Sequence, residues 1–212
     1  MKLLTEEDKK AISEAVQKAE ATTSGEIVFA VSEASARYHH ELLQASIVGM
    51  AAAAAIYLAL PVEHTIGILL WTQLVAFALF FAILPHLPPR RWIIPKREMD
   101  VRVYEAAFLE FYSSGLYRTR EANGVLIYLS VFEKRVVVIG DRGIHSKMGT
   151  QHWDAVRDRI IEGIKQGRAR DGICAAIQGC GEALAKHFPH QADDVNELFD
   201  QVIERKIRPD AP

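Results

Sequence analysis

The hydrophobic pattern is dominated by two long apolar segments in the first half of the chain. The segment 66–84 contains nineteen residues without a formal charge, which is about the length needed to cross a hydrocarbon core of ~30 Å. The segment 42–60 is weaker because it is rich in alanine, which is only slightly apolar on insertion scales. We therefore predict a transmembrane helical hairpin with its juxtamembrane linker over residues 41–96. The alternative is a helical hairpin buried in a soluble core.

The distribution of positive charge predicts the orientation of this hairpin. Arg37 precedes the first segment, and the connector 61–65 carries only one charged residue, Glu63. The second segment is followed by four basic residues, Arg90, Arg91, Lys96 and Arg97. Because positive residues stay on the cytoplasmic side, we expect an integral protein of the inner or plasma membrane. Its two transmembrane helices would leave both termini and the soluble domain in the cytoplasm.

The first apolar segment also carries small residues at helical spacing. Gly49 and Ala53 lie four residues apart and therefore share one helix face. Small residues let a neighbouring helix approach closely within a membrane. We therefore expect the hairpin to bind the lipid bilayer and to contact either a membrane-protein partner or a second copy of the chain.

Outside the hairpin, segments of helical and of strand periodicity alternate. Thr5 with an acid three residues later is a helix-start signature. The β-branched run 26–32 predicts a strand, and the nearly continuous apolar run 125–132 predicts a strand covered on both faces. The remaining predicted elements are a helix over 97–117, a strand over 136–139, a helix from 153 to near 167 and a helix from 171 that ends before Pro189.

The order of these elements predicts the fold class. A crossover joins the first two strands and favours a parallel pair, whereas the short corner at Glu133-Lys134 favours an antiparallel third strand. We therefore expect an α/β fold, in which a small mixed β-sheet is flanked by helices and interrupted by the two-helix transmembrane hairpin. The split domain would cover residues 1–40 and 97–190, and the tail 191–212 would add a short helix over 193–198.

Composition and motifs exclude several functional classes. The net charge of −2 gives no basic field for nucleic acid, so no nucleic-acid partner is expected. The sequence contains no Gly-rich Walker loop, no Gly-x-Ser-x-Gly elbow, no His-Glu-x-x-His and no Cys-x-x-Cys. The cofactor that remains to be considered is a divalent cation, calcium or magnesium.

Several short motifs resemble those of the TPM domain family. They are Ser24-Gly25-Glu26-Ile27-Val28, Gly124-Val125-Leu126-Ile127, the corner Glu133-Lys134-Arg135-Val136 and the stretch from Ile164 to Gly172-Ile173. The resemblance covers roughly residues 5–35 and 97–190, and it is to the bacterial branch in which two transmembrane segments interrupt the domain. It implies a small α/β sandwich. It also implies one of two roles, an accessory module of a membrane complex or an acid phosphatase that binds divalent cations.

The chain departs from the common family pattern at two acidic positions. Where many members carry an aspartate pair before an arginine, this chain has Phe132-Glu133-Lys134. Where many members carry a Gly-aromatic-Gly-Leu-Glu loop, it has Gly140-Asp141-Arg142-Gly143-Ile144. Both departures affect residues that would carry metal binding or phosphatase activity.

The predicted sheet nevertheless brings acidic residues to one edge. With parallel first and second strands, Glu26 and Asn123 share an edge, and the third strand returns Asp141 and Arg142 to it. Glu26, Asn123 and Asp141 are therefore the candidate metal ligands, since hard divalent cations prefer oxygen. Asp141 and Arg142 are the candidate catalytic residues, because an arginine binds phosphate well. The alternative is an edge ion pair between Glu26 and Arg142, with Asp141 capping a turn.

A second candidate site lies at the opposite edge, where Ser32, Glu33 and Glu133 come together. It has fewer basic partners than the first. From these observations we prefer an accessory or regulatory module for a membrane complex as the function. The alternative is a divalent-metal-dependent acid phosphatase.

Overall fold

The structure is a computed structural model that describes residues 4–86, 90–148, 151–190, 196–198 and 200–207. The chain divides into two compact units. The first unit joins residues 1–36 to residues 100–212, and the second comprises residues 37–99. The second unit is therefore inserted between two parts of the first in the sequence.

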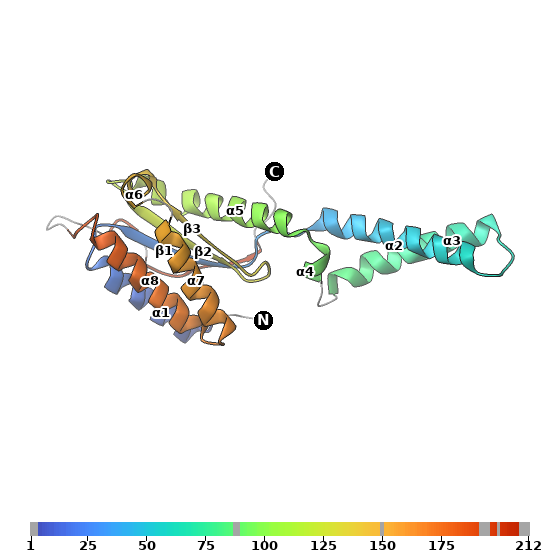
Figure 1. The fold of residues 1–212 in the computed structure, drawn as a ribbon, viewed down its shortest axis with the longest axis horizontal. Coiled ribbons are helices and arrows are strands. Elements are labelled where there is room, and N and C mark those ends of the chain that lie inside the picture. The colour runs from blue at the N-terminus through green and yellow to red at the C-terminus, as the bar shows by residue number, and fades with distance from the viewer. Residues whose placement is uncertain (1–3, 87–89, 149–150, 191–195, 199, 208–212) are drawn as a thin grey trace. The chain divides into compact units, whose positions relative to one another are not determined.

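The first unit is built on a mixed four-stranded sheet with the strand order β3-β2-β1-β4 (Figure 1). As predicted, β1 pairs in parallel with β2 and β2 pairs antiparallel with β3. Strand β4, which was not predicted, pairs in parallel with β1 at the other edge. The strands are β1 (Glu26–Ala34), β2 (Gly124–Ser130), β3 (Arg135–Gly140) and β4 (Ile203–Ile207).

The helix predicted over residues 193–198 of the tail is not observed in the described part of that range. Residues 196–198 are not helical, and residues 193–195 lie outside the described part of the chain. The tail instead contributes the edge strand β4, most of whose side chains are exposed. An exposed edge strand carries little of the apolar alternation by which buried strands are recognised.

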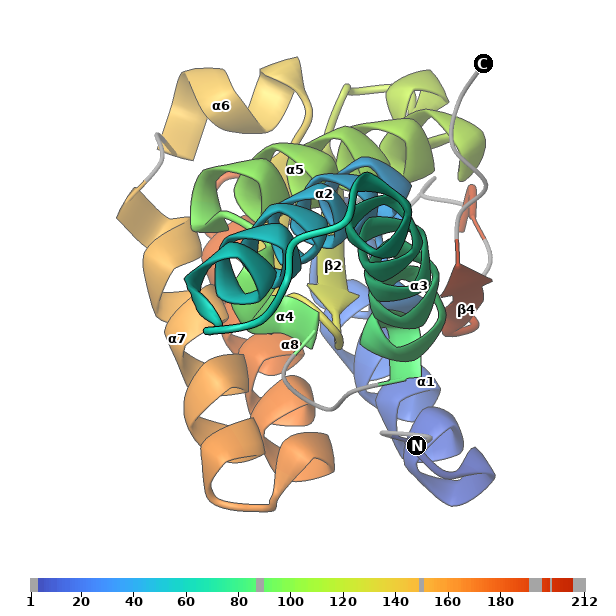
Figure 2. The same ribbon diagram turned by 90° about the vertical axis from the view of Figure 1, so that its right-hand side faces the viewer.

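Helices cover both faces of the sheet (Figure 2). One face is covered by α1 (Glu6–Glu20), α7 (Gln151–Lys165) and α8 (Ala169–Ala185), and the other by α5 (Lys96–Ser113). Two shorter helices, the 3-10 turn η2 (Leu116–Arg118) and α6 (Arg142–Met148), flank β2 and β3 in the sequence. The mixed sheet with helices on its faces confirms the predicted α/β class.

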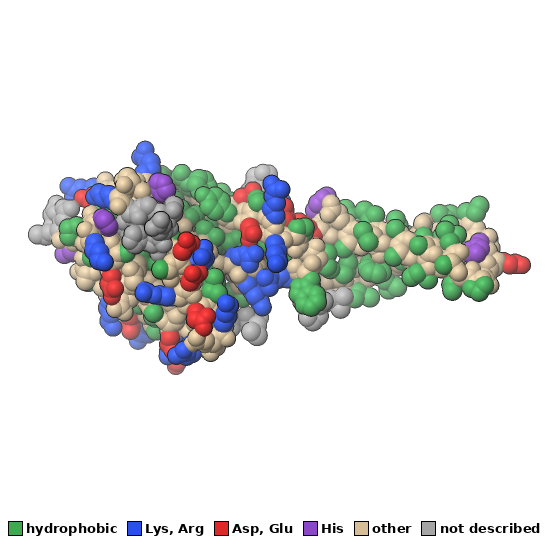
Figure 3. All heavy atoms as spheres, viewed as in Figure 1, with side chains coloured by type: hydrophobic (Ala, Val, Ile, Leu, Met, Phe, Trp, Pro, Cys, Tyr) green, Lys and Arg blue, Asp and Glu red, His purple; other side chains and the backbone are tan. Residues whose placement is uncertain are grey.

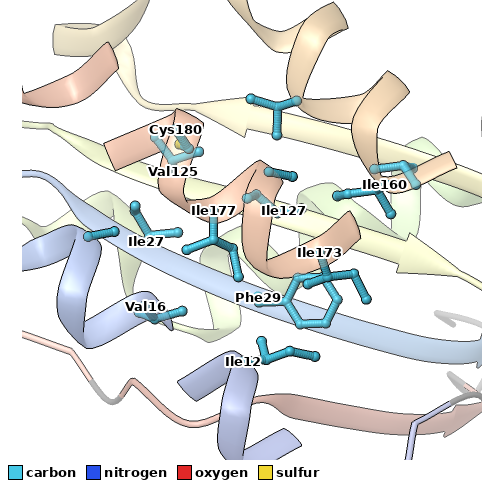
Figure 4. Close-up of a cluster of buried hydrophobic side chains, with 14 of the residues drawn as sticks. Ile12, Val16, Ile27, Phe29, Val125, Ile127, Ile160, Ile173, Ile177 and Cys180 are labelled. Carbon is cyan, nitrogen blue, oxygen red and sulfur yellow. The ribbon is translucent and has the colours of Figure 1, made fainter. Parts of the chain in front are cut away.

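The larger core lies between the sheet and the layer of three helices (Figure 4). Thr5 begins α1 with a capping box, in which the amide of Asp8 donates to Thr5 Oγ1 at 3.1 Å and the amide of Thr5 donates to Asp8 Oδ2 at 2.9 Å. This cap confirms the predicted helix start. The buried side chains of this core include Ile12, Val16, Ile27, Phe29, Val125, Ile127, Ile160, Ile173, Ile177 and Cys180.

The second core is smaller and lies between the sheet and α5. Val28 and Ala30 of β1 and Leu126 and Tyr128 of β2 face this helix, which follows from the alternation of side chains along a strand. They contact one buried stripe of α5 and η2, formed by Val103, Ala106, Ala107, Phe111 and Leu116.

The second unit consists of two long apolar helices and their following turns. These are α2 (His39–Ala59), α3 (Ile66–Ile83), the 3-10 turn η1 (Leu84–His86) and α4 (Arg90–Ile93). Both α2 and α3 are long and apolar enough to cross a membrane. Helix α3 contains no buried residue, and most of its large apolar side chains are exposed.

The two apolar helices pack closely at the predicted small residue. A Cβ atom added to Gly49 would lie 2.7 Å from the ring of Phe80, so the phenyl ring of α3 occupies the space that a larger residue would need. The connector is closed by Tyr57, whose hydroxyl accepts the amide of Thr65 at 3.0 Å. Residues 39–83 therefore form a helical hairpin within this unit.

Candidate functional site

The backbone brings the predicted site residues to one edge of the sheet. Glu26 pairs with Gly124 and Val125 pairs with Gly140, so Asn123 and Asp141 both lie next to the first residue of β2. Glu26 and Asp141 belong to strands separated by β2. Their backbones are therefore two strand spacings apart, about 9–10 Å.

The side chains at this edge make separate contacts. Glu26 Oε1 accepts the amide of Glu197 at 3.1 Å. Asn123 Nδ2 donates to the carbonyl of Ser24 at 2.5 Å. Asp141 Oδ1 accepts the amide of Arg142 at 2.6 Å. The carboxylate of Asp141 thus contacts its own helix start, while that of Glu26 contacts the chain that leads into β4.

An apolar side chain fills the space between the two carboxylates. A Cβ atom on Gly124 would lie 2.7 Å from Leu116 Cδ2. Leu116 therefore packs directly on Gly124, on the face of the sheet to which Glu26 and Asp141 belong by strand alternation. Within the described residues, no group of three His, Cys, Asp or Glu side chains is placed to hold a metal ion. Asn123 Oδ1 is buried and accepts no hydrogen bond there.

A divalent-metal site at Glu26, Asn123 and Asp141 stays a prediction, as does phosphatase chemistry at Asp141 and Arg142. The Leu116 packing gives no support to a shared cation between the two carboxylates. Titration of calcium and magnesium against the melting temperature, with phosphate-ester hydrolysis assayed beside Asp141→Ala, is the direct test of both.

Glu26 instead borders a cavity of about 250 Å³ that the sequence analysis did not identify. Its lining includes Glu20, Asp200, Asn196 and His190. Glu20 Oε1 accepts the amide of Ile27 at 2.7 Å. Burial raises the pKa of Glu20 to about 8, and the neighbouring carboxylates Glu26 and Asp200 add to the rise. The Thr23–Gly25 turn reverses the chain and places Glu20 beside Glu26, whereas Asp200 comes from the distant tail.

The second predicted edge contains a buried polar network. Glu133 is fully buried in the turn between β2 and β3. Its Oε1 accepts the amide of Ser35 at 2.9 Å, and its Oε2 accepts the hydroxyl of Ser130. The hydroxyls of Ser35 and Ser130 are 2.8 Å apart, and Tyr128 OH lies 3.3 Å from Ser35 Oγ.

This network ties the end of β1 to the β2–β3 turn. Ser32 at the same edge donates instead to the carbonyl of Ala34 at 2.8 Å, and Glu33 is exposed. Lys134 adopts the left-handed conformation with φ of 53°, which closes the turn beside Glu133. Ser130 and Glu133 are inaccessible to solvent, so they do not face a substrate site. We call the bonds from Glu133 to Ser35 and Ser130 the Glu133 clamp, because they hold the end of β1 to the β2–β3 turn. The clamp lies just before the residue at which the chain leaves for the apolar hairpin.

An ion pair lies on the same face of the sheet. Arg205 of β4 pairs in register with Ser32 and donates from Nε and Nη2 to the two carboxylate oxygens of Glu110 of α5, at 3.1 and 3.0 Å. Glu110 is fully buried. Hydrogen bonding to Glu110 raises the pKa of Arg205, and burial raises the pKa of Tyr128. This pair was not predicted, because Arg205 lies on β4, the strand that the hydrophobic pattern does not reveal.

The fold defines an α/β domain with a mixed sheet that is interrupted by an apolar hairpin. The TPM domain model matches residues 78–183, which is half of the chain. The chain therefore belongs to the TPM domain family. Among solved structures it is similar to the NMR structure of the BA42 protein from Bizionia argentinensis, with 26% identity, a TM-score of 0.59 and 96% of each chain covered. A search of curated proteins found no match.

Proposed function

We propose that the chain is an integral membrane protein that presents its TPM domain at the cytoplasmic face and serves as an accessory or regulatory module for a membrane complex. The observation that carries this proposal is the surface of α3. Most of its large apolar side chains are exposed although the helix packs on α2, with Ile66 at 77% and Trp71 at 67%. A helix in a soluble core buries at least one face, whereas a helix that is apolar all round is typical of a membrane span.

The position of the hairpin in the chain supports the proposed regulatory role. The hairpin is inserted between β1 and β2, the two neighbouring parallel strands at the centre of the sheet. Both ends of the hairpin therefore connect to the domain, and one of them directly follows Ser35, which the Glu133 clamp holds. A change in the packing of α2 and α3 within a membrane complex would act on the end of β1 through this short connection.

Membrane integration is tested by a charged substitution in the middle of α3. Leu74→Arg costs about 2.5–3.5 kcal/mol at the centre of a span, and we expect it to shift the protein out of the carbonate-resistant membrane fraction. The matched control is Gln178→Arg, which adds the same charge to an exposed position of α8. Extraction of the unmodified chain by alkaline carbonate without detergent would contradict the proposal.

Topology and partnership need separate measurements. A cysteine introduced at Glu63 should react with an impermeant maleimide in intact cells, whereas one introduced at Lys206 should react only after permeabilisation. For partnership, the full chain is purified in mild detergent and its mass is compared with that of the monomer. We expect either a co-purifying membrane protein or self-association, and a solitary monomer would refute the accessory role.

A further inference from the structure

The outer face of α5 carries a stripe of exposed apolar side chains. Tyr104 is 57% exposed, Phe108 45% and Tyr112 48%, and Val101 and Leu109 of the same helix are exposed as well. The inner face of the same helix already packs on the sheet. The exposed stripe therefore contributes nothing to the core of the domain.

The other helical layer shows that this stripe is not a general property of the domain. In the described parts of α1, α7 and α8, no large hydrophobic side chain is exposed. Figure 3 shows charged side chains over that layer and hydrophobic ones over α5. Contiguous exposed apolar surface of this kind marks a site that contacts a protein or a membrane.

The chemistry of the stripe suits a boundary between water and hydrocarbon. The ring centroids of Tyr104 and Phe108 are 6.5 Å apart, those of Phe108 and Tyr112 are 4.9 Å apart, and those of Tyr112 and Tyr117 are 5.2 Å apart. Arg118 donates to the hydroxyl of Tyr117 at 2.8 Å. Tyrosine combines an apolar ring with a polar tip, which is why it gathers at membrane interfaces.

The chain that joins α3 to α5 identifies the bilayer as the occupant. Helix α5 begins at Lys96, and only twelve residues separate it from the end of α3 at Ile83. Residues 90–97 contain four basic residues and no acidic one, and Trp92 among them is 88% exposed. Basic residues of this kind attract anionic head groups, and exposed tryptophan anchors a chain at the interface.

Two acidic residues beside the stripe, Asp100 and Glu105, are paired with arginines. Asp100 Oδ1 accepts from Arg135 Nε at 2.5 Å, and Glu105 lies 3.3 Å from Arg102. Two acids that would repel an anionic surface are therefore largely neutralised. What remains is an apolar face that follows a basic segment, and this combination suits contact with an anionic lipid surface.

We propose that the outer face of α5, formed by Val101, Tyr104, Phe108, Leu109 and Tyr112, lies against the head-group region of the bilayer. This inference rests on the proposed membrane integration. It adds a second contact with the lipid surface, in which the TPM domain itself is held against the membrane by its α5 face.

Spin labels placed one at a time on the full chain test this contact. The background is Cys174→Ala with Cys180→Ala, and the protein is reconstituted into vesicles of phosphatidylethanolamine and phosphatidylglycerol. Labels are attached after Tyr104→Cys, Phe108→Cys or Tyr112→Cys. Two control positions are Trp71→Cys in α3 and Gln178→Cys on the exposed face of α8. We expect the α5 labels to show a ratio of oxygen to water-soluble nickel accessibility several-fold above that at position 178.

The controls separate the outcomes. If the label at 71 reports lipid but the α5 labels match position 178, the interfacial contact is overturned while membrane integration stands. If the label at 71 reports water, membrane integration itself fails. If the α5 labels are immobile and inaccessible to both reagents, the face is covered by protein, either a second copy or another membrane protein, and the lipid contact is refuted.

Discussion

The two faces of the sheet are covered in opposite ways. Three helices, α1, α7 and α8, bury the larger core on one face and present a polar surface to solvent. A single helix, α5, buries a smaller core on the other face and presents an apolar surface. The two faces of the inner strands β1 and β2 also differ in the polarity of their side chains. Their side chains toward the three helices, such as Ile27 and Val125, are apolar, whereas the set toward α5 includes Glu26, Ser32 and Ser130.

This asymmetry separates what holds the domain together from what connects it to its surroundings. The three-helix face has the features of an ordinary soluble core, which folding alone explains. The α5 face carries a buried clamp at Glu133, a buried ion pair at Glu110 and exposed aromatic rings. Exposed apolar side chains do not stabilise the domain in water, and buried polar groups stabilise it only while they are paired, so this face carries the features that require a functional explanation.

The largest effect we predict comes from a cavity in the three-helix core. Ile177→Ala removes a fully buried side chain and should lower the free energy of unfolding of the detergent-solubilised chain by about 2–5 kcal/mol. Phe108→Ala removes a larger side chain from the exposed stripe of α5, and its effect should stay within about 0.5 kcal/mol. Chemical denaturation followed by circular dichroism compares the two variants.

The proposed difference between the two faces is contradicted if Phe108→Ala lowers the free energy of unfolding as much as Ile177→Ala does. In that case the outer face of α5 would be part of the folded core, and its exposure would not mark a contact surface.

The second effect concerns the clamp on the α5 side of the sheet. Glu133→Ala leaves the buried amide of Ser35 and the hydroxyl of Ser130 without their acceptor and should cost about 1–3 kcal/mol. Glu133→Gln keeps one acceptor oxygen and should cost less. Hydrogen exchange at the amide of Ser35 measures the local effect. Equal exchange in the unmodified chain and in Glu133→Ala would show that the clamp does not hold the end of β1.

The third effect, ranked by its slope per pH unit, is a pH dependence from the end of α1. The pKa of Glu20 is about 8 in the folded state against 4.5 for the free side chain, so the folded state binds the proton more tightly. Its contribution to stability is full below pH 4.5 and is lost as the pH rises to 8, by at most about 1.4 kcal/mol per pH unit. Glu20→Gln should remove this slope while keeping an acceptor for Ile27. The difference in unfolding free energy between the two chains, measured from pH 5 to 8, checks the prediction, and a constant difference would contradict it.

The elements with strong periodicity could be predicted from the sequence, and those with weak periodicity could not. The capping box of α1 and the apolar runs of β1 and β2 mark elements by local chemistry alone. Strand β4 was missed because its sequence, Ile-Glu-Arg-Lys-Ile, keeps charged residues on an exposed edge. Helix α6 was missed because seven residues that begin Arg-Gly read as a loop.

Strand register predicts which site residues share an edge of the sheet, but it does not predict how their side chains pack. Strand pairing correctly places Glu26, Asn123 and Asp141 at one edge, because register follows from the hydrophobic pattern. It cannot show that Leu116 packs over Gly124 between them, since that contact comes from a turn outside the sheet. The burial of Glu133 could not be predicted from the sequence either, because a Glu-Lys-Arg triplet is typical of an exposed corner.

The smallest effect comes from the ion pair at the border of the exposed stripe. Asp100 and Arg135 are both partly exposed, so Asp100→Asn should change the unfolding free energy by less than about 1 kcal/mol. The same substitution removes a negative charge beside the apolar face, so it should strengthen attraction to anionic vesicles. With the spin label on Phe108→Cys, we expect deeper insertion in vesicles that contain phosphatidylglycerol and no change in neutral ones. The matched control, Asp158→Asn on α7, removes a similarly exposed, arginine-paired acid from the three-helix face and should change neither the unfolding free energy nor the label depth. A deeper label in neutral vesicles would mean that packing on β3, and not charge, sets the position of α5.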